Sequence, residues 1–376
     1  MLQEFLVKLE QLVNIDSWSH DPVGVSAVAD VIEGWYRDLG WRVQRHDVGA
    51  EAGPVLEISN RGNERFDAVF LGHMDTVFRP GTVAQRPFRV EGDRAYGPGV
   101  SDMKAGLVTM YFIAKALSAD PENAPAVCML CNPDEEIGSR SSMEKMCEIT
   151  ARSSRLYVLE SPGDQADLHC YARRGIRPVE VVFRGQSAHA GNILETPGAS
   201  AILEAARWTE FFCGLVDRGK GITANVGVIE GGLATNVVPD YAKIRAEVRT
   251  DTPEDMNVVM EKILQRAANP VTLGVTVEVT AGAGRPPLVP SAGTMAEIRR
   301  AESVAASLGQ SFRVEKCGSV TDANNLCAAL PELICLDDMG PAGGGFHAPQ
   351  EYLELASVEP CVALLTALVK ELKPSS

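Results

Sequence analysis

Short apolar runs without alternation recur along this chain, and several of them lead into a residue that can bind a metal. Residues 67–72, 156–159 and 333–336 are runs of this kind, rich in leucine and β-branched side chains. Such runs are typical of strands that are buried on both faces of a parallel sheet. Because they alternate with helical segments before and after residues 177–280, they predict an open, mostly parallel α/β sheet.

Residues 177–280 interrupt this pattern with another order of elements. Their periodicity predicts strand, helix, strand, strand, helix and strand, the order of a ferredoxin-like α+β domain. The expected segments are Val179–Phe183, Ala199–Val216, Ile222–Ile229, Tyr241–Val248, Pro253–Ala267 and Val275–Thr280. A chain of 376 residues predicts about two domains. We expect a discontinuous domain formed by residues 1–175 and 285–376, and a domain formed by residues 176–284 inserted into it.

Composition and charge narrow the classes of partner and compartment. The net charge of −15 argues against a nucleic acid or an anionic membrane as partner. No apolar run is long enough to span a bilayer, and Met1–Lys8 begins an amphipathic helix rather than a signal peptide. Nine cysteines without regular spacing fit a reducing compartment, so we expect a cytoplasmic protein. Cys128 and Cys131 lie inside an apolar strand, which predicts buried, inert thiols.

Two adjacent acids, Glu135 and Glu136, follow a further apolar run. Successive side chains at a strand end point to different sides, so one carboxylate can bind a metal while its neighbour takes a proton from water. An acidic surface turn is the structural alternative, since charge runs are usually solvated.

Three further strand-like runs lead to metal-capable residues. His73 and Asp75 follow residues 67–72, Glu160 follows residues 156–159, and His347 comes after a glycine-rich loop. Ligands of open α/β sheets lie just beyond the carboxyl ends of such strands. Asp102 stands where a Gly/Pro-rich turn opens onto an apolar helix, and helix capping is the alternative for it.

Together these segments supply two imidazoles and three carboxylates, a mixture that suits zinc or a similar divalent metal. The five residues are His73, Asp102, Glu136, Glu160 and His347. Five ligands are one too many for a simple tetrahedral site. If Asp102 bridges two metals, the residues divide into two sets of three and leave room for a shared water.

The chain resembles the bacterial glutamate carboxypeptidases, within the wider di-zinc family of aminoacylases, acetylornithine deacetylases and succinyl-diaminopimelate desuccinylases. The resemblance covers nearly the whole length. Its most specific motifs are His73-Met74-Asp75-Thr76-Val77, Pro87-Phe88-Arg89-Val90-Glu91-Gly92-Asp93, Tyr96-Gly97-Pro98-Gly99, Asp134-Glu135-Glu136, Ser187-Ala188-His189-Ala190-Gly191, Gly284-Arg285-Pro286-Pro287 and Gly343-Gly344-Gly345-Phe346-His347 with Glu351-Tyr352.

The resemblance implies two zinc ions per subunit, with cobalt or manganese as substitutes. One ion would be held by His73, Asp102 and Glu160, and the other by Asp102, Glu136 and His347. Asp75 would accept the imidazole N–H of His73 and fix its tautomer. Glu135 would act as the general base that removes a proton from metal-activated water.

Substrate contacts are implied in the inserted domain and in the glycine-rich loop. His189 is the candidate donor to the oxyanion, and in relatives this histidine reaches across a dimer interface, so the resemblance implies a homodimer with a lid-like dimerisation domain. Asn236 and Arg285 match the residues that hold the substrate carboxylate. Structural readings are open for each: a loop histidine, a turn residue and a solvated arginine. Gly344 can add a backbone N–H, or belong simply to a flexible loop.

The leading expectation is a hydrolase that cleaves an amide bond in a small peptide and releases a C-terminal amino acid, glutamate being the first candidate. The alternative is deacylation of an N-acyl amino acid, and an inactive metal-binding protein is a third. Glu135 beside the five ligands speaks against the third, because a pure binder has no use for a base. Ser319 and Val320 replace glycines of the glutamate carboxypeptidases, and Met103 is typical of the deacetylases, so substrate fit stays open.

Overall fold

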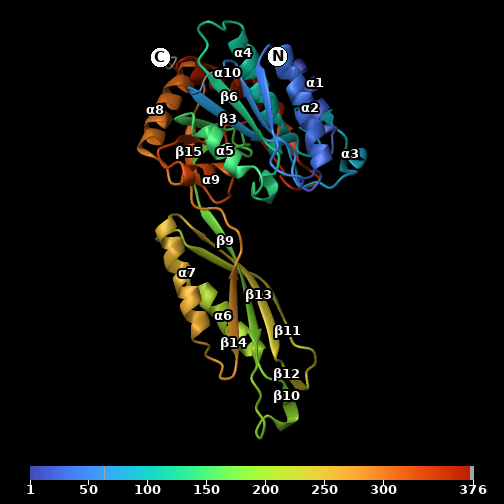
Figure 1. Ribbon diagram of the computed structural model, residues 1–376, viewed down its shortest axis with the longest axis vertical. Coiled ribbons are helices and arrows are strands. Elements are labelled where there is room, and N and C mark those ends of the chain that lie inside the picture. The colour runs from blue at the N-terminus through green and yellow to red at the C-terminus, as the bar shows by residue number, and fades with distance from the viewer. Residues whose placement is uncertain (63, 373–376) are drawn as a thin grey trace. The chain divides into compact units, whose positions relative to one another are not determined.

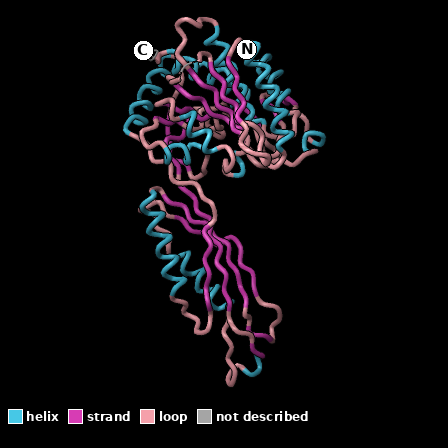
Figure 2. The backbone as a smooth tube through the Cα atoms, in the orientation of Figure 1, coloured by secondary structure: helices cyan, strands magenta, loops and turns pink. Residues whose placement is uncertain are grey.

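The computed structural model describes residues 1–62 and 64–372, and the chain divides into two compact units. The first unit contains Met1–Ala172, Pro290–Cys317 and the chain from Thr321 onward. The second contains Arg173–Val289 and the short segment Gly318–Val320. Each unit has its own hydrophobic core. Figure 1 shows the elements by residue colour, and Figure 2 separates helices from strands.

A six-stranded sheet forms the centre of the first unit. Its strands, in spatial order, are β1 (Arg42–His46), β2 (Val55–Ser59), β6 (Val127–Asn132), β3 (Ala68–His73), β7 (Arg155–Val158) and β16 (Ile334–Leu336). The last four are mutually parallel, whereas β1 and β2 form an antiparallel edge. The prediction of an open, mostly parallel sheet is confirmed.

Helices cover this sheet on both faces, since every residue of β3 and β6 is buried. The helices of the first unit are α1 (Leu2–Val13), α2 (Pro22–Asp38), α3 (Thr82–Gln85), α4 (Ala105–Ser118), α5 (Met143–Thr150), α8 (Ala292–Ser307), α9 (Asp322–Ala329) and α10 (Val358–Lys370). The short α3 buries none of its residues and is not part of this cover. No helix among the described residues is both long enough and apolar enough to cross a membrane. Cys128 and Cys131 are buried free thiols in β6, as predicted.

Two small sheets complete the first unit. One pairs β8 (Leu168–Arg173) with β15 (Arg313–Cys317). The other has the order β17 (Gly343–Gly344), β18 (Tyr352–Glu354), β5 (Arg94–Tyr96) and β4 (Arg89–Glu91). Both join segments that are far apart in the sequence, and they hold loops at the carboxyl edge of the main sheet.

The second unit is a four-stranded antiparallel sheet with two helices. Its elements are β9 (Gly175–Arg184), α6 (Ala201–Gly214), β11 (Thr223–Gly231), β13 (Tyr241–Thr250), α7 (Pro253–Ala268) and β14 (Thr276–Ala281). A short ribbon pairs β10 (Ala188–His189) with β12 (Val237–Val238). The spatial order β11-β13-β9-β14 is that of a ferredoxin-like fold, which confirms the predicted fold of the insert.

A buried ionic cluster attaches α8 to the main sheet. The Glu297 carboxylate accepts hydrogen bonds from Tyr157 of β7 and from Arg300, and Arg300 also donates to the Tyr157 hydroxyl over 3.0 Å. Burial opposes ionisation of Glu297, but the bonds from Arg300 and Tyr157 outweigh it and lower its pKa. The ionised carboxylate therefore stabilises the fold above the usual glutamate pKa, and this contribution is lost as the pH falls below it.

We expect Glu297→Gln to lower the free energy of unfolding by about 2 kcal/mol at neutral pH, because charged hydrogen bonds are replaced by neutral ones. Urea unfolding at pH 7 and at progressively lower pH measures this. The gap between variant and wild type should narrow as the pH falls below 4.5, because the unfolded chain takes up the proton there before the folded carboxylate, whose pKa is lowered, does so. Exposed Glu122 provides a control: Glu122→Gln should leave both curves unchanged.

Candidate metal centre

Three neighbouring strands bring imidazole and carboxylate groups to one edge of the main sheet. His73 is the last residue of β3, Glu160 follows β7 by two residues, and Glu135 and Glu136 lie in a short 3₁₀ turn after β6. Since these strands are parallel neighbours, their carboxyl ends meet at the same edge. The sequence pattern therefore corresponds to a real spatial cluster.

Asp102 enters this edge from the turn before α4. The helix begins at Ala105 with Lys104 at its N-cap and no side-chain capping bond, so capping does not explain Asp102. The carboxylate of Glu351, 1% exposed, accepts hydrogen bonds from the backbone N–H groups of Gly99, Ser101 and Asp102 over 2.9 to 3.0 Å. Three bonds to one buried carboxylate fix the path of the turn that carries Asp102.

His347 reaches the same edge from the loop after β17. Its backbone has φ 59°, a left-handed conformation that histidine adopts more readily than most residues. A side chain at Gly343 would place Cβ only 2.1 Å from the Ser101 hydroxyl, so this strand can lie against the Asp102 turn only as glycine. Gly344 is buried and pairs with Tyr352 of β18.

The five side chains form two groups that share the Asp102 carboxylate. His73 Nε2 lies 3.1 Å from Asp102 Oδ1 and 3.5 Å from Glu160 Oε1. His347 Nε2 lies 3.2 Å from Asp102 Oδ2 and 3.2 Å from Glu136 Oε2. Each oxygen of Asp102 thus belongs to a different group, and each group contains one imidazole and two carboxylates.

These distances match the requirements of a divalent metal. In a tetrahedral site with Zn–N and Zn–O bonds of about 2.0 to 2.1 Å, neighbouring ligand atoms lie about 3.3 Å apart. The distances of 3.1 to 3.5 Å within each group are close to this value. Ligand atoms of His73, Asp102 and Glu136, which come from both groups, lie within 4.8 Å of one another, so the two groups adjoin. The donor set and its spacing therefore fit one cation in each group, with Asp102 between them.

Asp75 is buried completely and connects the two halves of the cluster. Its carboxylate accepts hydrogen bonds from the Ser19 hydroxyl over 2.7 Å and from the backbone N–H groups of Glu135 and Glu136 over 3.1 and 3.2 Å. The Nδ1 atom of His73 lies 3.0 Å from the Asp75 carbonyl oxygen and 3.3 Å from its Oδ1. Asp75 therefore orients the His73 ring and the Glu135-Glu136 turn together.

Glu135 is only 8% exposed, which excludes the reading of an acidic surface turn. Its negative charge is one of the influences that raise the pKa of Glu160. Asp322, at the start of α9, stabilises the segment that carries Glu135. Its carboxylate accepts hydrogen bonds from the side chains of Asn132 and Ser139 on either side of that segment. A buried glutamate on a fixed turn beside candidate metal ligands is well placed to move a proton.

Burial and the neighbouring charges shift the pKa values of the carboxylates and imidazoles in the cluster. Burial raises the pKa of Glu160 and of Glu136. Hydrogen bonds to Asp102 and Glu136 raise the pKa of His347 to about 10. Burial opposes ionisation of Asp102, but the bonds from His347 and His73 lower its pKa overall. Positive charge is therefore strongly favoured between these carboxylates, and a divalent cation would replace the protons of both rings.

Two further predicted site residues lie in the second unit. His189 ends β10, and the backbone N–H of Ala190 donates to the carbonyl oxygen of Asn236 over 2.9 Å, so His189 and Asn236 are brought side by side. His189 is exposed, and its Nδ1 accepts a hydrogen bond from the Gly191 N–H over 3.0 Å. This bond places the proton of the neutral ring on Nε2, which is free to donate to a ligand.

Arg285 lies elsewhere in the second unit. Its backbone forms hydrogen bonds of 2.9 and 3.0 Å with Ile176, near the start of β9, and the residue is 9% exposed. The strand continues to Arg184, eight residues farther on, a span of about 27 Å. Figure 1 shows β10 and β12 beyond that far end. Arg285 and His189 therefore stand at opposite ends of the unit.

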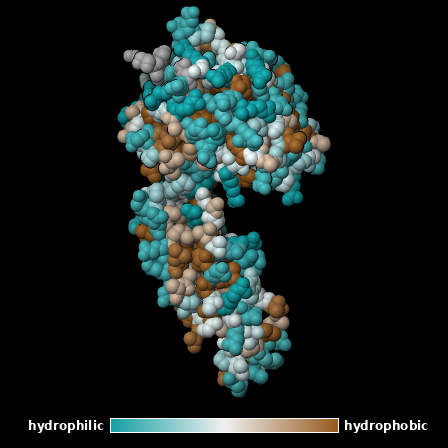
Figure 3. Space-filling model, in the orientation of Figure 1, coloured by the Kyte–Doolittle hydropathy of each residue, from teal (hydrophilic) through white to brown (hydrophobic). Residues whose placement is uncertain are grey.

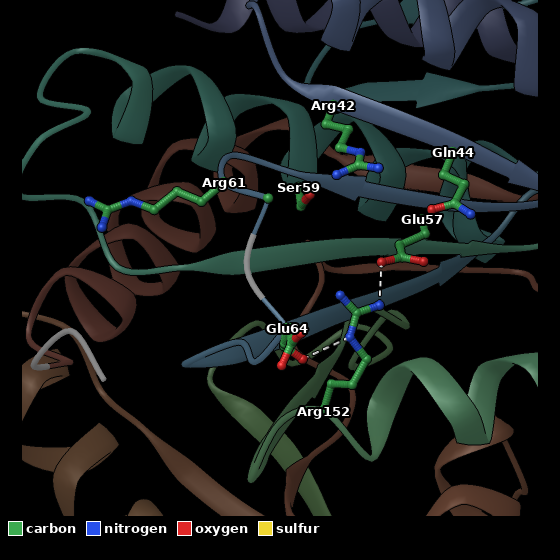
Figure 4. Close-up of a pocket in the computed structure, with 8 residues that line it drawn as sticks. Arg42, Gln44, Glu57, Ser59, Arg61, Glu64 and Arg152 are labelled. Atoms are coloured by element: carbon green, nitrogen blue, oxygen red, sulfur yellow. Dashed lines mark hydrogen bonds and ion pairs between the residues drawn. The ribbon is translucent and has the colours of Figure 1, made fainter. Parts of the chain in front are cut away.

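A separate pocket of about 370 Å³ opens at the β1–β2 edge of the first unit and contains none of the predicted site residues. Figure 4 shows Arg152 bonded to Glu57 and to the backbone of Glu64. Arg61 donates to main-chain carbonyl oxygens at residues 121, 122 and 124. These arginines are engaged in holding loops, so the pocket adds nothing to the metal centre.

Two residues that support the cluster through hydrogen bonds were not predicted as site residues. Ser19 contacts Asp75 from a loop far away in the sequence, and nothing in its surroundings distinguishes it. Glu351 follows His347 by four residues within a motif of the resemblance, and its burial and its three N–H donors become visible only in the structure.

An open α/β sheet with paired imidazole–carboxylate groups at its carboxyl edge, and a ferredoxin-like insert, is the architecture of a metal-dependent peptidase or amidohydrolase. The chain belongs to peptidase family M20/M25/M40, whose model matches residues 69–371. This confirms the resemblance inferred from the motifs.

Individual relatives span the whole fold. Carboxypeptidase G2 of Pseudomonas sp. (strain RS-16) is 29% identical over 97% of this chain and 88% of its own length. A succinyl-diaminopimelate desuccinylase of Burkholderia multivorans is 26% identical over 81% of this chain and 82% of its own. The crystal structure of aminopeptidase PepT from Bacillus cereus superposes with a TM-score of 0.82 at 23% identity, covering 99% of both chains.

Proposed function

We propose that this protein uses two divalent metal ions, zinc in the first instance, to hydrolyse an amide bond and release a C-terminal amino acid, with glutamate as the first candidate. The observation that carries the proposal is the Asp102 carboxylate between two imidazole–carboxylate groups, with the buried Glu135 beside them. Two groups of this kind match a pair of metals, and Glu135 supplies a base that a mere binding site would not need.

His73, Asp102 and Glu160 would hold one ion, and Asp102, Glu136 and His347 the other. Bound there, such ions would lower the pKa of a water molecule from about 15.7 to about 7, which would make hydroxide available at neutral pH. Glu135 accepts the proton of the attacking water. As the carbon–nitrogen bond breaks, Glu135 returns this proton to the leaving nitrogen, which departs as a neutral amine.

His189, Asn236, Arg285 and Gly344 are proposed for the substrate side. The Nε2–H of His189 suits an oxyanion, whose charge develops as water attacks the carbonyl carbon. The Arg285 guanidinium can bind a carboxylate through two hydrogen bonds, with the Asn236 amide as an additional donor. Gly344 would contribute its backbone N–H.

The distance between Arg285 and His189 supports a homodimer. Groups about 27 Å apart on one unit cannot touch the same small substrate, so two chains must contribute if both residues act on it. Large apolar side chains are exposed in loops near His189, with Leu194 92% and Leu233 95% exposed. Figure 3 shows hydrophobic residues on the visible face of this unit. Surface of this kind favours association with a second copy.

A mixing experiment tests whether His189 acts in trans. We expect His189→Ala and Glu135→Gln to be nearly inactive alone. Mixed and allowed to exchange subunits, they should recover roughly a quarter of wild-type turnover, because half of the dimers are mixed and each mixed dimer has one complete site. A chain with both substitutions, mixed with His189→Ala, is the control and should recover nothing. Subunit exchange without recovery would contradict the arrangement.

The reaction itself is tested with a panel of dipeptides and N-acyl amino acids, with and without a chelator, by measuring amine release. Chelator-sensitive release chiefly from substrates with a C-terminal glutamate would support the carboxypeptidase proposal. Absence of release from every compound would count against hydrolysis and favour a binding protein.

Deacylation of an N-acyl amino acid is the second candidate. It uses the same proton transfers with a different acyl pocket. The desuccinylase relative and Met103 beside Asp102 favour it. Ser319 and Val320, in place of glycines of the glutamate carboxypeptidases, speak against a close match to that substrate. Preference for short acyl groups over peptides in the same panel would select this function.

A further inference from the structure

Outside the centre described above, two thiols and a carboxylate from three separate segments of the first unit converge. Cys170 lies in β8, Cys317 is the last residue of β15, and Asp338 follows β16 by two residues. Their ligand atoms all lie within 4.8 Å of one another, and Cys317 Sγ is 3.6 Å from Asp338 Oδ2. None of these residues belongs to the proposed catalytic centre.

We propose that Cys170, Cys317 and Asp338 form an additional binding site for a thiophilic divalent cation such as Zn²⁺. With Zn–S bonds of about 2.3 Å and a Zn–O bond of about 2.0 Å, tetrahedral ligands lie about 3.5 Å apart for sulfur and oxygen, and about 3.8 Å for two sulfurs. The observed 3.6 Å matches the first value. No two ligand atoms of the cluster are more than 4.8 Å apart, so a sulfur shift of about 1 Å is enough to reach the spacing of two zinc-bound sulfurs.

Backbone hydrogen bonds fix the positions of Asp338 and Cys170 relative to each other. Cys170 and Asp337 exchange two backbone hydrogen bonds, each 2.9 Å long. The N–H of Asp338 donates to Asp337 Oδ1 over 2.7 Å, and the His169 ring donates from Nδ1 to the Asp338 carbonyl oxygen over 2.9 Å. Asp338 also has φ 55°, a conformation in which only a few residue types are common. This support resembles the outer hydrogen bonds that orient metal ligands in proteins.

Ligand chemistry and burial decide which ion the site would take. Sulfur ligands select zinc and softer metals over magnesium or calcium, which prefer oxygen. Cys170 is buried, whereas Cys317 and Asp338 are half-buried, so an ion can enter from solvent and keep water as its fourth ligand. Bound there, it would cross-link β8, β15 and the turn after β16, close to the points where the chain leaves the first unit at Ala172 and Cys317.

Cobalt distinguishes this site from the proposed catalytic centre, which offers only nitrogen and oxygen ligands. Metal-free, reduced protein is titrated with Co²⁺ without oxygen, and near-ultraviolet sulfur-to-cobalt charge-transfer absorption is recorded. We expect this absorption to saturate by the point at which the two catalytic ions and one further cobalt per chain are bound. It should disappear in Cys317→Ser and weaken strongly in Asp338→Asn, a change that φ 55° tolerates because asparagine adopts it readily. Cys213→Ser, at an exposed cysteine, should retain it.

The proposal is overturned if saturated wild-type protein shows no such absorption, or if Cys317→Ser keeps it in full. A thiol titration in denaturant that finds two fewer than the nine cysteines, restored by reductant, would also overturn it, because Cys170 and Cys317 would then form a disulfide. Zinc should raise the thermal unfolding midpoint of wild type more than that of Cys317→Ser. None of these measurements depends on catalysis.

Discussion

Glu135→Gln should lower turnover by about 10²- to 10⁴-fold while leaving the bound metal in place. Neither imidazole–carboxylate group includes this carboxylate, so in the proposed arrangement its loss removes a proton acceptor and no ligand. Glutamine has nearly the same shape, and the backbone bond from residue 135 to Asp75 stays available. The fold and the metal groups should therefore survive. Steady-state kinetics and metal analysis of the same preparation measure both effects.

Glu122→Gln, at an exposed glutamate, is the matched control and should keep full turnover. Two results would contradict the role of Glu135. Unchanged turnover would mean that another group takes the proton. Loss of metal together with turnover would mean that Glu135 is itself a ligand, and the division into two groups of three would then be wrong.

The sequence predicted the sheet and most of the cluster because both depend on local pattern. His73, Glu136 and Glu160 each follow an apolar strand, and parallel strands end at a common edge, so their proximity follows from strand order. The ferredoxin-like order of the insert was predicted by the same periodicity. The catalytic and binding roles of these residues stay predictions until the substitutions are made.

Other features depend on tertiary contacts that no local pattern contains. The bond from Asp102 to Glu351 joins positions 249 residues apart, and the two small sheets of the first unit also pair distant segments. Cys170 and Cys317 meet only because β8 and β15 are neighbours. The irregular spacing of the cysteines therefore indicated only free thiols, whereas the fold brings two of them close to Asp338.

Asp102→Asn should lower turnover at least as much as Glu135→Gln does. The cause would be loss of bound metal rather than loss of a proton acceptor. Each oxygen of this carboxylate faces a different imidazole, His73 or His347, at 3.1 and 3.2 Å, so one substitution weakens both groups. An amide offers one neutral oxygen and cannot bridge two cations as a carboxylate does. If about 4 kcal/mol of transition-state stabilisation is lost, turnover falls by about 10³-fold. We expect fewer than two catalytic metals per chain.

Asp164→Asn, at an exposed aspartate, should leave metal content and turnover unchanged. The Asp102 variant should also keep the sulfur-to-cobalt absorption expected from Cys170 and Cys317, since those ligands lie in other segments. Equilibrium dialysis against Zn²⁺, followed by metal analysis and kinetics, measures how many catalytic ions the Asp102→Asn variant binds and how fast it turns over. Two tightly bound catalytic ions and normal turnover in Asp102→Asn would show that the carboxylate is not shared. One retained ion with normal turnover would mean that a single metal suffices for the reaction.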